Sequence, residues 1–135
     1  MPELPFPDDV RALLTKPNPA VVATLRSDGQ PVSVATWYLL EDDDRVLLNM
    51  DDTRVRLRHL RRDPRVSLTI TDADNWYTHV SLVGRVEGIV ADEGLVDIDR
   101  LSTHYGGSPY PDRESPRTSA HVVVERWHGW GAARQ

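Results

Sequence analysis

The chain has 135 residues, of which 16 are basic and 21 acidic, so its net charge is −5, and it has no cysteine. This length predicts one domain over residues 1–135, while the lack of cysteine excludes disulfides, thiol nucleophiles and thiolate metal ligands. The acidic balance argues against nucleic acid as a partner. The chain has neither an apolar run of the roughly 20 residues that span a bilayer nor a signal-peptide pattern. We therefore expect a cytoplasmic protein without a membrane partner.

The first half of the chain is predicted to form short strands separated by turns. Residues 1–18 are expected to be an N-terminal helical segment, in which Asp8 or Asp9 caps a short helix and Pro17 ends it. A Ser-Asp-Gly-Gln turn predicts a hairpin, and Glu41 begins an acidic turn. β-branched and apolar residues predict strands over residues 20–26, 31–40, 45–50 and 65–71.

The second half contains a long alternating segment, a helix and a final strand. Residues 76–90 predict a fifth strand and leave a sixth open, with Gly84 and Gly88 allowing bends or bulges. Apolar residues at helical spacing predict a helix from Asp92 as its cap to Tyr105, followed by a loop rich in glycine and proline. The last strand is expected over residues 121–127 and a C-terminal tail over residues 128–135. Together these elements predict a mainly β, α+β fold, a closed or split barrel of about six antiparallel strands with short flanking helices.

Residues 53–66 form the most basic stretch of the chain. They contain six arginines and one acid, Asp63, whereas the rest of the chain has 10 basic and 20 acidic residues. A helix is predicted here, and Pro64 ends it because it disfavours a helical conformation at Asp63. Positive charge concentrated on one short helix of an acidic protein predicts a binding site for an anion, most simply a phosphate.

The arginines of this predicted helix fall on two sides. Arg54, Arg58 and Arg62 share a stripe that faces water, and the two leucines of the helix face the barrel. Arg56 and His59 flank the seam between helix and sheet, where a guanidinium can grip a phosphate with two parallel hydrogen bonds. Backbone N–H groups at the start of the helix add to the attraction.

Two other interpretations of the basic helix remain open. The first is a solvated basic face that is paired with the acidic turns at residues 41–44 and 51–52. The second is binding to nucleic acid, which is weakened because no strand face with interleaved aromatic residues lies near the arginines.

The order of strands and the string from His59 to Arg65 (His-Leu-Arg-Arg-Asp-Pro-Arg), preceded by Arg56, resemble the pyridoxamine 5'-phosphate oxidase-like split β-barrel superfamily. Within it, the resemblance is to actinobacterial oxidoreductases that depend on the deazaflavin coenzyme F-420. The opening Val-Val-Ala-Thr-Leu-Arg-Ser-Asp-Gly-Gln-Pro-Val and the late Pro-Arg followed by His-Val-Val-Val-Glu-Arg-Trp-His-Gly-Trp also fit. The resemblance covers residues 8–130 and implies a split barrel of the FMN-binding type.

The resemblance also implies a site. Arg56 matches the residue that binds the cofactor phosphate, with Arg54 assisting, and His59 stands where asparagine is common. The second strand, including Ser33, would lie along the cofactor ring. Members are usually homodimers with cofactor sites at the interface, so the partner chain is expected to contribute His79, Trp127 or Trp130, while Tyr38 is expected near the ring. The expected cofactor-binding residues are Arg54, Arg56, His59, Arg61, Thr36, Trp37, Ala35, Asn49, Met50 and Thr53.

Flavin and deazaflavin cofactors carry out hydride transfer themselves, so such a protein needs no catalytic triad or metal. The sequence contains neither a triad nor a paired-carboxylate motif, and its five histidines lack the helical spacing of a zinc site, so no metal is expected. No catalytic residue is assigned. The proton donor is left open between solvent, Tyr38, His79 and Tyr105. The four tryptophans (37, 76, 127 and 130) are expected in core or dimer packing.

The deazaflavin coenzyme carries a phosphodiester and a polyglutamate tail, whereas FMN carries one phosphate. The arginines beyond Arg56 (54, 58, 61 and 62) favour the longer polyanion, so coenzyme F-420 is preferred and FMN is the alternative. The expected function is an oxidoreductase that transfers hydride to a small organic acceptor as its small-molecule substrate. The alternatives are an FMN-dependent oxidoreductase, a non-catalytic carrier of flavin or deazaflavin, and a haem protein with His79 or His128 as ligand.

Overall fold

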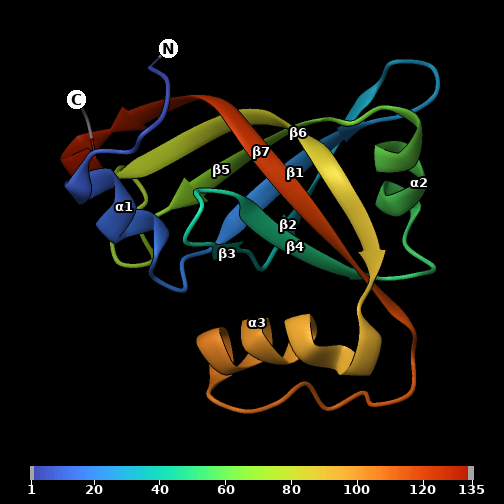
Figure 1. Cartoon of the computed structure of the whole chain (residues 1–135). Coiled ribbons are helices and arrows are strands. Elements are labelled where there is room, and N and C mark those ends of the chain that lie inside the picture. The colour runs from blue at the N-terminus through green and yellow to red at the C-terminus, as the bar shows by residue number, and fades with distance from the viewer. Residues whose placement is uncertain (1, 134–135) are drawn as a thin grey trace.

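The computed structural model describes residues 2–133 (Figure 1), in which seven strands form one antiparallel sheet. Three α-helices and two short 3-10 turns accompany the sheet in these residues. The predicted mainly β, α+β architecture is confirmed. In chain order the elements are α1 (Asp8–Leu14), β1 (Ala20–Leu25), β2 (Pro31–Thr36), β3 (Leu39–Leu40), β4 (Val46–Asp51), α2 (Val55–Arg62), β5 (Arg65–Thr71), β6 (His79–Ala91), η1 (Glu93–Leu95), α3 (Val96–Gly106), β7 (Arg117–Trp130) and η2 (Gly131–Ala133).

The order of the strands shows how the sheet curls into a barrel. It is β2-β1-β5-β6-β7-β4-β3, so the consecutive strands β2 and β3 lie at opposite edges of the sheet. Only Trp37 and Tyr38 separate them. A link of three Cα steps spans at most about 11 Å, so the sheet must curve until its two edges approach each other. The single strand predicted over residues 31–40 is therefore wrong: the chain leaves one edge at Thr36 and joins the other at Leu39.

The strand β6 settles the alternative left open for residues 76–90. They contain one strand, which begins at His79, and its pairing with β7 shifts register between Val83 and Gly84 and between Val86 and Gly88. The predicted bends at the two glycines are confirmed. At Gly84 a Cβ atom would lie 2.1 Å from the carbonyl oxygen of Val123, so a side chain there would push the two strands apart.

The strand β7 is longer than the predicted strand over residues 121–127. It begins at Arg117 and ends at Trp130, so it includes residues 128–130, where the tail was expected. Pairing explains the extra length, because β7 hydrogen-bonds to β4 at its start and to β6 along its whole course. Residues 134–135 of the predicted tail, and Met1 of the predicted N-terminal segment, lie outside the described residues.

The barrel interior and its two ends are filled by apolar side chains. The N-terminal segment covers one end, where Phe6 contacts the buried Trp127 edge to face and the indole N–H of Trp127 donates to the Glu3 carbonyl at 3.2 Å. Leu57 and Leu60 of α2 are buried against the barrel, as predicted. Burying such a side chain contributes roughly 1.5–3 kcal/mol. No helix among the described residues is long and apolar enough to cross a membrane.

Candidate functional site

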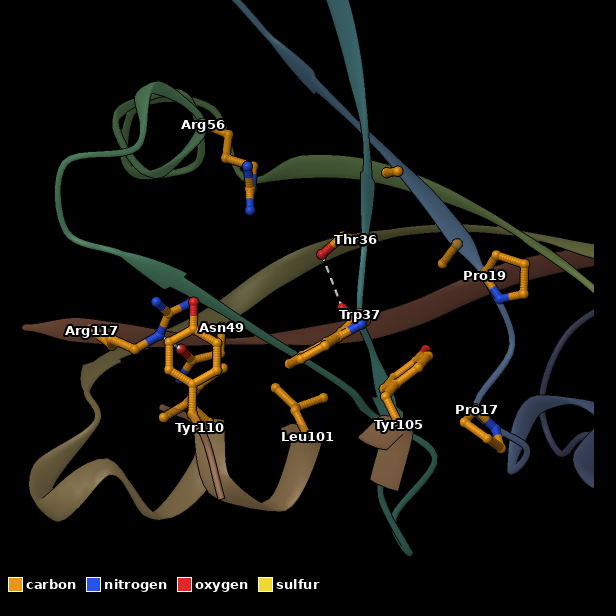
Figure 2. A pocket seen from close by; sticks show the side chains of 13 residues that line it. Pro17, Pro19, Thr36, Trp37, Asn49, Arg56, Leu101, Tyr105, Tyr110 and Arg117 are labelled. Carbon is orange, nitrogen blue, oxygen red and sulfur yellow. Dashed lines mark hydrogen bonds between the residues drawn. The ribbon is translucent and has the colours of Figure 1, made fainter. Parts of the chain in front are cut away.

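A cavity of about 560 Å³ lies between the barrel, the first turn of α2 and the segment that contains α3 (Figure 2). Consecutive residues at the end of β2 contribute to it, together with β4, β7 and the loop after α3. Because β2 and β4 belong to distant positions in the sheet, only the closure of the barrel brings these residues together. The lining residues are Pro17, Pro19, Ala20, Ala35, Thr36, Trp37, Asn49, Arg56, Ile98, Leu101, Tyr105, Tyr110 and Arg117.

Arg56 extends from α2 toward this cavity, as Figure 2 shows. Among the described residues it forms no hydrogen bond or ion pair. Its pKa is lowered below the ordinary arginine value, first by burial and then by the charges of Arg54 and Arg117. The guanidinium is nonetheless charged near neutral pH, because arginine remains protonated in proteins. A half-buried cation without an acidic partner is suited to an anionic ligand.

Arg117, at the start of β7, is a second guanidinium in the same cavity. Its Nε–H donates to Asn49 Oδ1 at 2.7 Å, and its guanidinium carbon lies 4.7 Å from the centroid of the Tyr110 ring. Sequence reasoning did not assign this residue to the site. Arg117 belongs to the Pro-Arg pair that carries part of the family resemblance. The sequence therefore contained a sign of its importance, although the resemblance implied no function for it.

Asn49 links Arg117 to the start of the helix α3 through Asp92. Its amide nitrogen donates to Asp92 Oδ2 and to Ser119 Oγ, each at 3.0 Å. The Asp92 carboxylate also accepts the backbone N–H groups of Asp97 and Ile98, each at 2.9 Å. The predicted capping role of Asp92 is therefore confirmed, although the helix that it caps begins later, at Val96. These bonds leave the Asn49 carbonyl oxygen facing Arg117.

The other wall of the cavity is aromatic. The Trp37 ring stacks on the Tyr105 ring with centroids 5.3 Å apart and an angle of 10°, and Tyr110 meets Trp37 edge to face at 6.2 Å. The Tyr105 hydroxyl donates to the Asn18 carbonyl at 2.7 Å and accepts the backbone N–H of Tyr38 at 3.3 Å. Burial raises the pKa of Tyr105 to about 12. This wall therefore presents flat ring surfaces, while its hydroxyl is already engaged.

A second cavity of about 440 Å³ lies on the other side of Arg56, which lines both. It contains Arg26, Arg54 and His59. His59 is buried, and its Nδ1 hydrogen-bonds to Thr24 Oγ1 at 2.9 Å. Its pKa is lowered, first by burial and then by the charges of Arg62, Arg58 and Arg26, so the imidazole is neutral near neutral pH. Two adjoining cavities with basic side chains thus share one guanidinium.

The predicted site residues fall into four groups, of which the last lies in the barrel core. The 560 Å³ cavity is lined by Ala35, Thr36, Trp37, Asn49 and Arg56, and the second cavity by Ser33, Arg54 and His59. Neither cavity is lined by the exposed Thr53 and Arg61. The same is true of His79 and Trp130, which are opposite each other in the pairing of β6 with β7.

Two predicted residues point into the barrel core instead. Alternation along β4 places Asn49 on the cavity side and Met50, which is 1% exposed, on the core side. Tyr38 is 0% exposed, and its hydroxyl hydrogen-bonds to the carbonyl oxygens of Leu14 and Lys16 at 2.8 and 3.2 Å. Burial raises the pKa of Tyr38. Met50 and Tyr38 were expected beside a cofactor, but each side chain fills the barrel interior and lines neither cavity.

Sequence reasoning missed the contribution of the helix α3 itself. Leu101 and Ile98 line the cavity as well as packing the small cluster beneath it. Their helical spacing had indicated a core-facing stripe, which says nothing about a cavity. The proline residues 17 and 19, expected only to end a helix, also lie at the rim. No cluster of three or more His, Asp or Glu side chains suited to a metal ion occurs within residues 2–133.

Comparison with known proteins supports this description of the fold. Residues 6–131 match the family model of pyridoxamine 5'-phosphate oxidase. An F420 reductase is 27% identical, with a TM-score of 0.80 over 90% of this chain and 97% of that one. The conserved hypothetical protein Rv2991 from Mycobacterium tuberculosis is 27% identical, with a TM-score of 0.73 over 96% and 87%. A heme binding protein from Mycobacterium smegmatis, at 20% identity and a TM-score of 0.65 over 95% of this chain and 56% of that one, shares the fold. The chain belongs to the pyridoxamine 5'-phosphate oxidase family.

Proposed function

We propose that this protein is an oxidoreductase that binds the deazaflavin coenzyme F-420 and supports hydride transfer to a small organic acceptor. The observation that carries the proposal is the position of Arg56. This guanidinium is half-buried, has no acidic partner among the described residues and lies where two cavities meet. A cofactor with a flat ring at one end and an anionic chain at the other matches that arrangement.

The residues present fit such a cofactor. A cavity of about 560 Å³ is within the roughly 300–1,000 Å³ that small-molecule sites occupy. The ring surfaces of Trp37 and Tyr105 suit a planar ring, and Arg56 suits a phosphate. Arg54, in the second cavity, has no carboxylate partner among the described residues and suits an anionic chain that continues beyond the phosphate. Arg26 in the same cavity pairs with Asp28 at 3.2 Å, an exposed and therefore weak ion pair that a ligand anion can replace. When bound, the flavin or deazaflavin supplies the hydride chemistry, and the protein binds and orients it.

The polar groups of the site bind and orient rather than transfer protons. The hydroxyls of Tyr38 and Tyr105 are bonded to backbone carbonyl oxygens, and burial raises the pKa of each. Of the four proton sources expected from the sequence, solvent is therefore favoured over these two tyrosines. His79 lines neither cavity, so a role for it requires a contribution from a second copy of the chain.

The choice between coenzyme F-420 and FMN depends on the second cavity. FMN carries a single phosphate, which Arg56 and Arg54 can bind without further cations. The additional Arg26 in that cavity and the exposed arginines of α2 favour a longer polyanion. The likeness to an F420 reductase supports the same choice. FMN is the alternative cofactor, and a carrier that binds the cofactor without turnover is the alternative role.

Haem is not favoured as the ligand of the 560 Å³ cavity. No histidine is among the residues that line it, and His59, in the second cavity, uses Nδ1 for Thr24. His79 and His128, expected as haem ligands if this were a haem protein, lie on β6 and β7 and line neither cavity.

The edge strand β2 supports an assembly of two copies. Most of its residues are exposed, including Val34 at 42%, and the neighbouring Trp37 and Val21 are 38% and 44% exposed. An edge strand with apolar side chains exposed beside a cofactor cavity is a surface that a second copy can cover. We expect a homodimer with β2 at the interface, which light scattering during size-exclusion chromatography measures directly.

Titration of the purified protein with coenzyme F-420, FMN, riboflavin and haem tests the proposal. We expect coenzyme F-420 to bind most tightly, FMN more weakly, and riboflavin weaker still because it has no phosphate for Arg56. Turnover of small quinones with the reduced cofactor then separates an enzyme from a carrier. Equal affinity for FMN and riboflavin would refute the role of Arg56, and tightest binding of haem would overturn the proposal.

A further inference from the structure

We infer that Arg117 binds a carboxylate of the acceptor, so that the substrates of this protein are organic acids. The inference rests on the proposed function, because it assigns the second guanidinium of the cavity to the molecule that reacts with the cofactor. Arg56 and Arg117 line the same cavity. Neither arginine has a carboxylate within ion-pair distance among the described residues. A single cofactor phosphate bound at Arg56 would leave Arg117 without an anion.

The two guanidinium groups line the same cavity but have different neighbours. Arg56 is shared with the second cavity, where Arg26 and Arg54 continue the positive charge. Arg117 lies instead with Asn49 and Tyr110, on the side of α3. An anionic chain that runs from Arg56 into the second cavity enters a space that Arg117 does not line. The anion at Arg117 is therefore assigned to a second molecule, beside Asn49 and Tyr110.

Arg117 is held in one orientation before any ligand binds. Its Nε–H is committed to Asn49 Oδ1 at 2.7 Å, and the Tyr110 ring lies against the guanidinium. Asn49 is itself fixed by Asp92 and Ser119. Preorganisation of this kind reduces the entropy that binding must overcome. The two terminal nitrogens of Arg117 form no hydrogen bond with any residue that the structure describes, and they can donate a pair of parallel hydrogen bonds, the pattern that a carboxylate accepts.

The surrounding charges leave Arg117 available to an anion. Asp51 and Asp112 are near enough for the charge of Arg117 to lower their pKa values. Neither carboxylate forms a hydrogen bond or an ion pair with Arg117 in the described residues. Asp51 accepts from Thr53, and Asp112 accepts the backbone N–H groups of Glu114 and Ser115. A ligand carboxylate at Arg117 would also offset the repulsion between Arg117 and Arg56.

The test compares benzoate with benzamide, which has the same shape and no charge. Each is titrated into the FMN-loaded protein by following the flavin absorbance, and into the free protein by following tryptophan fluorescence. We expect the wild-type protein to bind benzoate about tenfold or more tightly than benzamide, as a charge-assisted pair predicts. Arg117→Gln should remove this preference and change the affinity for FMN by less than about twofold.

Arg126→Gln is the matched control, since it removes one exposed positive charge on β7 away from the cavity. It should keep the preference. The inference is overturned if benzoate fails to bind, if benzamide binds equally well, or if the preference survives in Arg117→Gln or is lost equally in Arg126→Gln. Weakened FMN binding in Arg117→Gln with benzoate unaffected would assign the residue to the cofactor and also overturn it. A wild-type protein that binds no cofactor but keeps the benzoate preference would refute the proposed function, and with it the acceptor role, while the carboxylate site at Arg117 would stand.

Discussion

The arginines beside α3 and the arginines of the cavity are the same chemical group in two different settings. Arg100 donates to Glu41 at 2.8 Å, and Arg113 donates to Asp99 at 2.6 Å, so both are neutralised at the surface. Arg56 has no such partner, and Arg117 bonds only to an uncharged amide and a ring. The number of arginines in a sequence therefore does not define an anion site. The absence of a carboxylate partner does, because an unneutralised, partly buried cation gains most from a ligand anion.

The largest expected effect is that of Arg56→Gln on cofactor binding. Loss of a charge-assisted pair to a phosphate should weaken binding of FMN or coenzyme F-420 about 100-fold, while riboflavin binding stays unchanged. Thermal stability should be equal to or above that of the wild type, because the variant removes a desolvated charge that two other arginines repel. Fluorescence titration and a melting curve measure both quantities. A variant that is less stable and still binds FMN normally would show that Arg56 serves the fold.

Asp92→Asn tests the buried carboxylate that holds Asn49 and the start of α3 in place. Asp92 accepts from Asn49 and from two backbone N–H groups at the start of α3, all in a buried setting. We expect a loss of about 2 kcal/mol in the free energy of unfolding, because hydrogen bonds to a buried charged group are replaced by weaker ones. Urea denaturation measures it. Asp97→Asn, at the partly buried carboxylate that accepts from Ser119, is the comparison and should cost less.

A pH dependence follows from His59. Burial, then Arg62, Arg58 and Arg26, lower its pKa in the folded protein below the ordinary value of 6.5. As the pH falls below 6.5 the unfolded chain takes up a proton that the folded protein does not, so stability is full above that pH and declines below it. The contribution cannot exceed about 1.4 kcal/mol per pH unit. Urea denaturation at pH 7 and pH 5 should show a smaller decline in His59→Asn than in the wild type; equal declines would contradict the assignment.

The smallest expected effect is that of Arg100→Gln. Its ion pairs with Glu41 and Asp97 are partly exposed, and such pairs contribute at most about 1 kcal/mol. Cofactor binding should not change, because Arg100 lines neither cavity. Weakening of FMN binding to the extent expected for Arg56→Gln would mean that the total positive charge, and not the absence of a partner, attracts the cofactor. Denaturation and titration on the same sample decide the matter.

Much of the fold was predictable because it depends on local pattern. The strand over residues 65–71, the helix that ends before Pro64 and the bends at Gly84 and Gly88 were all predicted from alternation, turn residues and glycine. The break at Trp37 and Tyr38 was not. Both residues are good strand formers, and only the need to connect opposite edges of the sheet turns the chain there.

For the site, the sequence by itself determined where positive charge is concentrated and that Arg56 lies at the seam between α2 and the barrel. Only the tertiary structure decided which arginines remain without an acidic partner. Arg117 bonds to Asn49 across 68 residues of chain, and Arg100 bonds to Glu41 across 59. Neutralisation of a charge depends on groups a few ångströms away in space, and a pattern read along the chain does not contain those distances. Barrel closure supplied them.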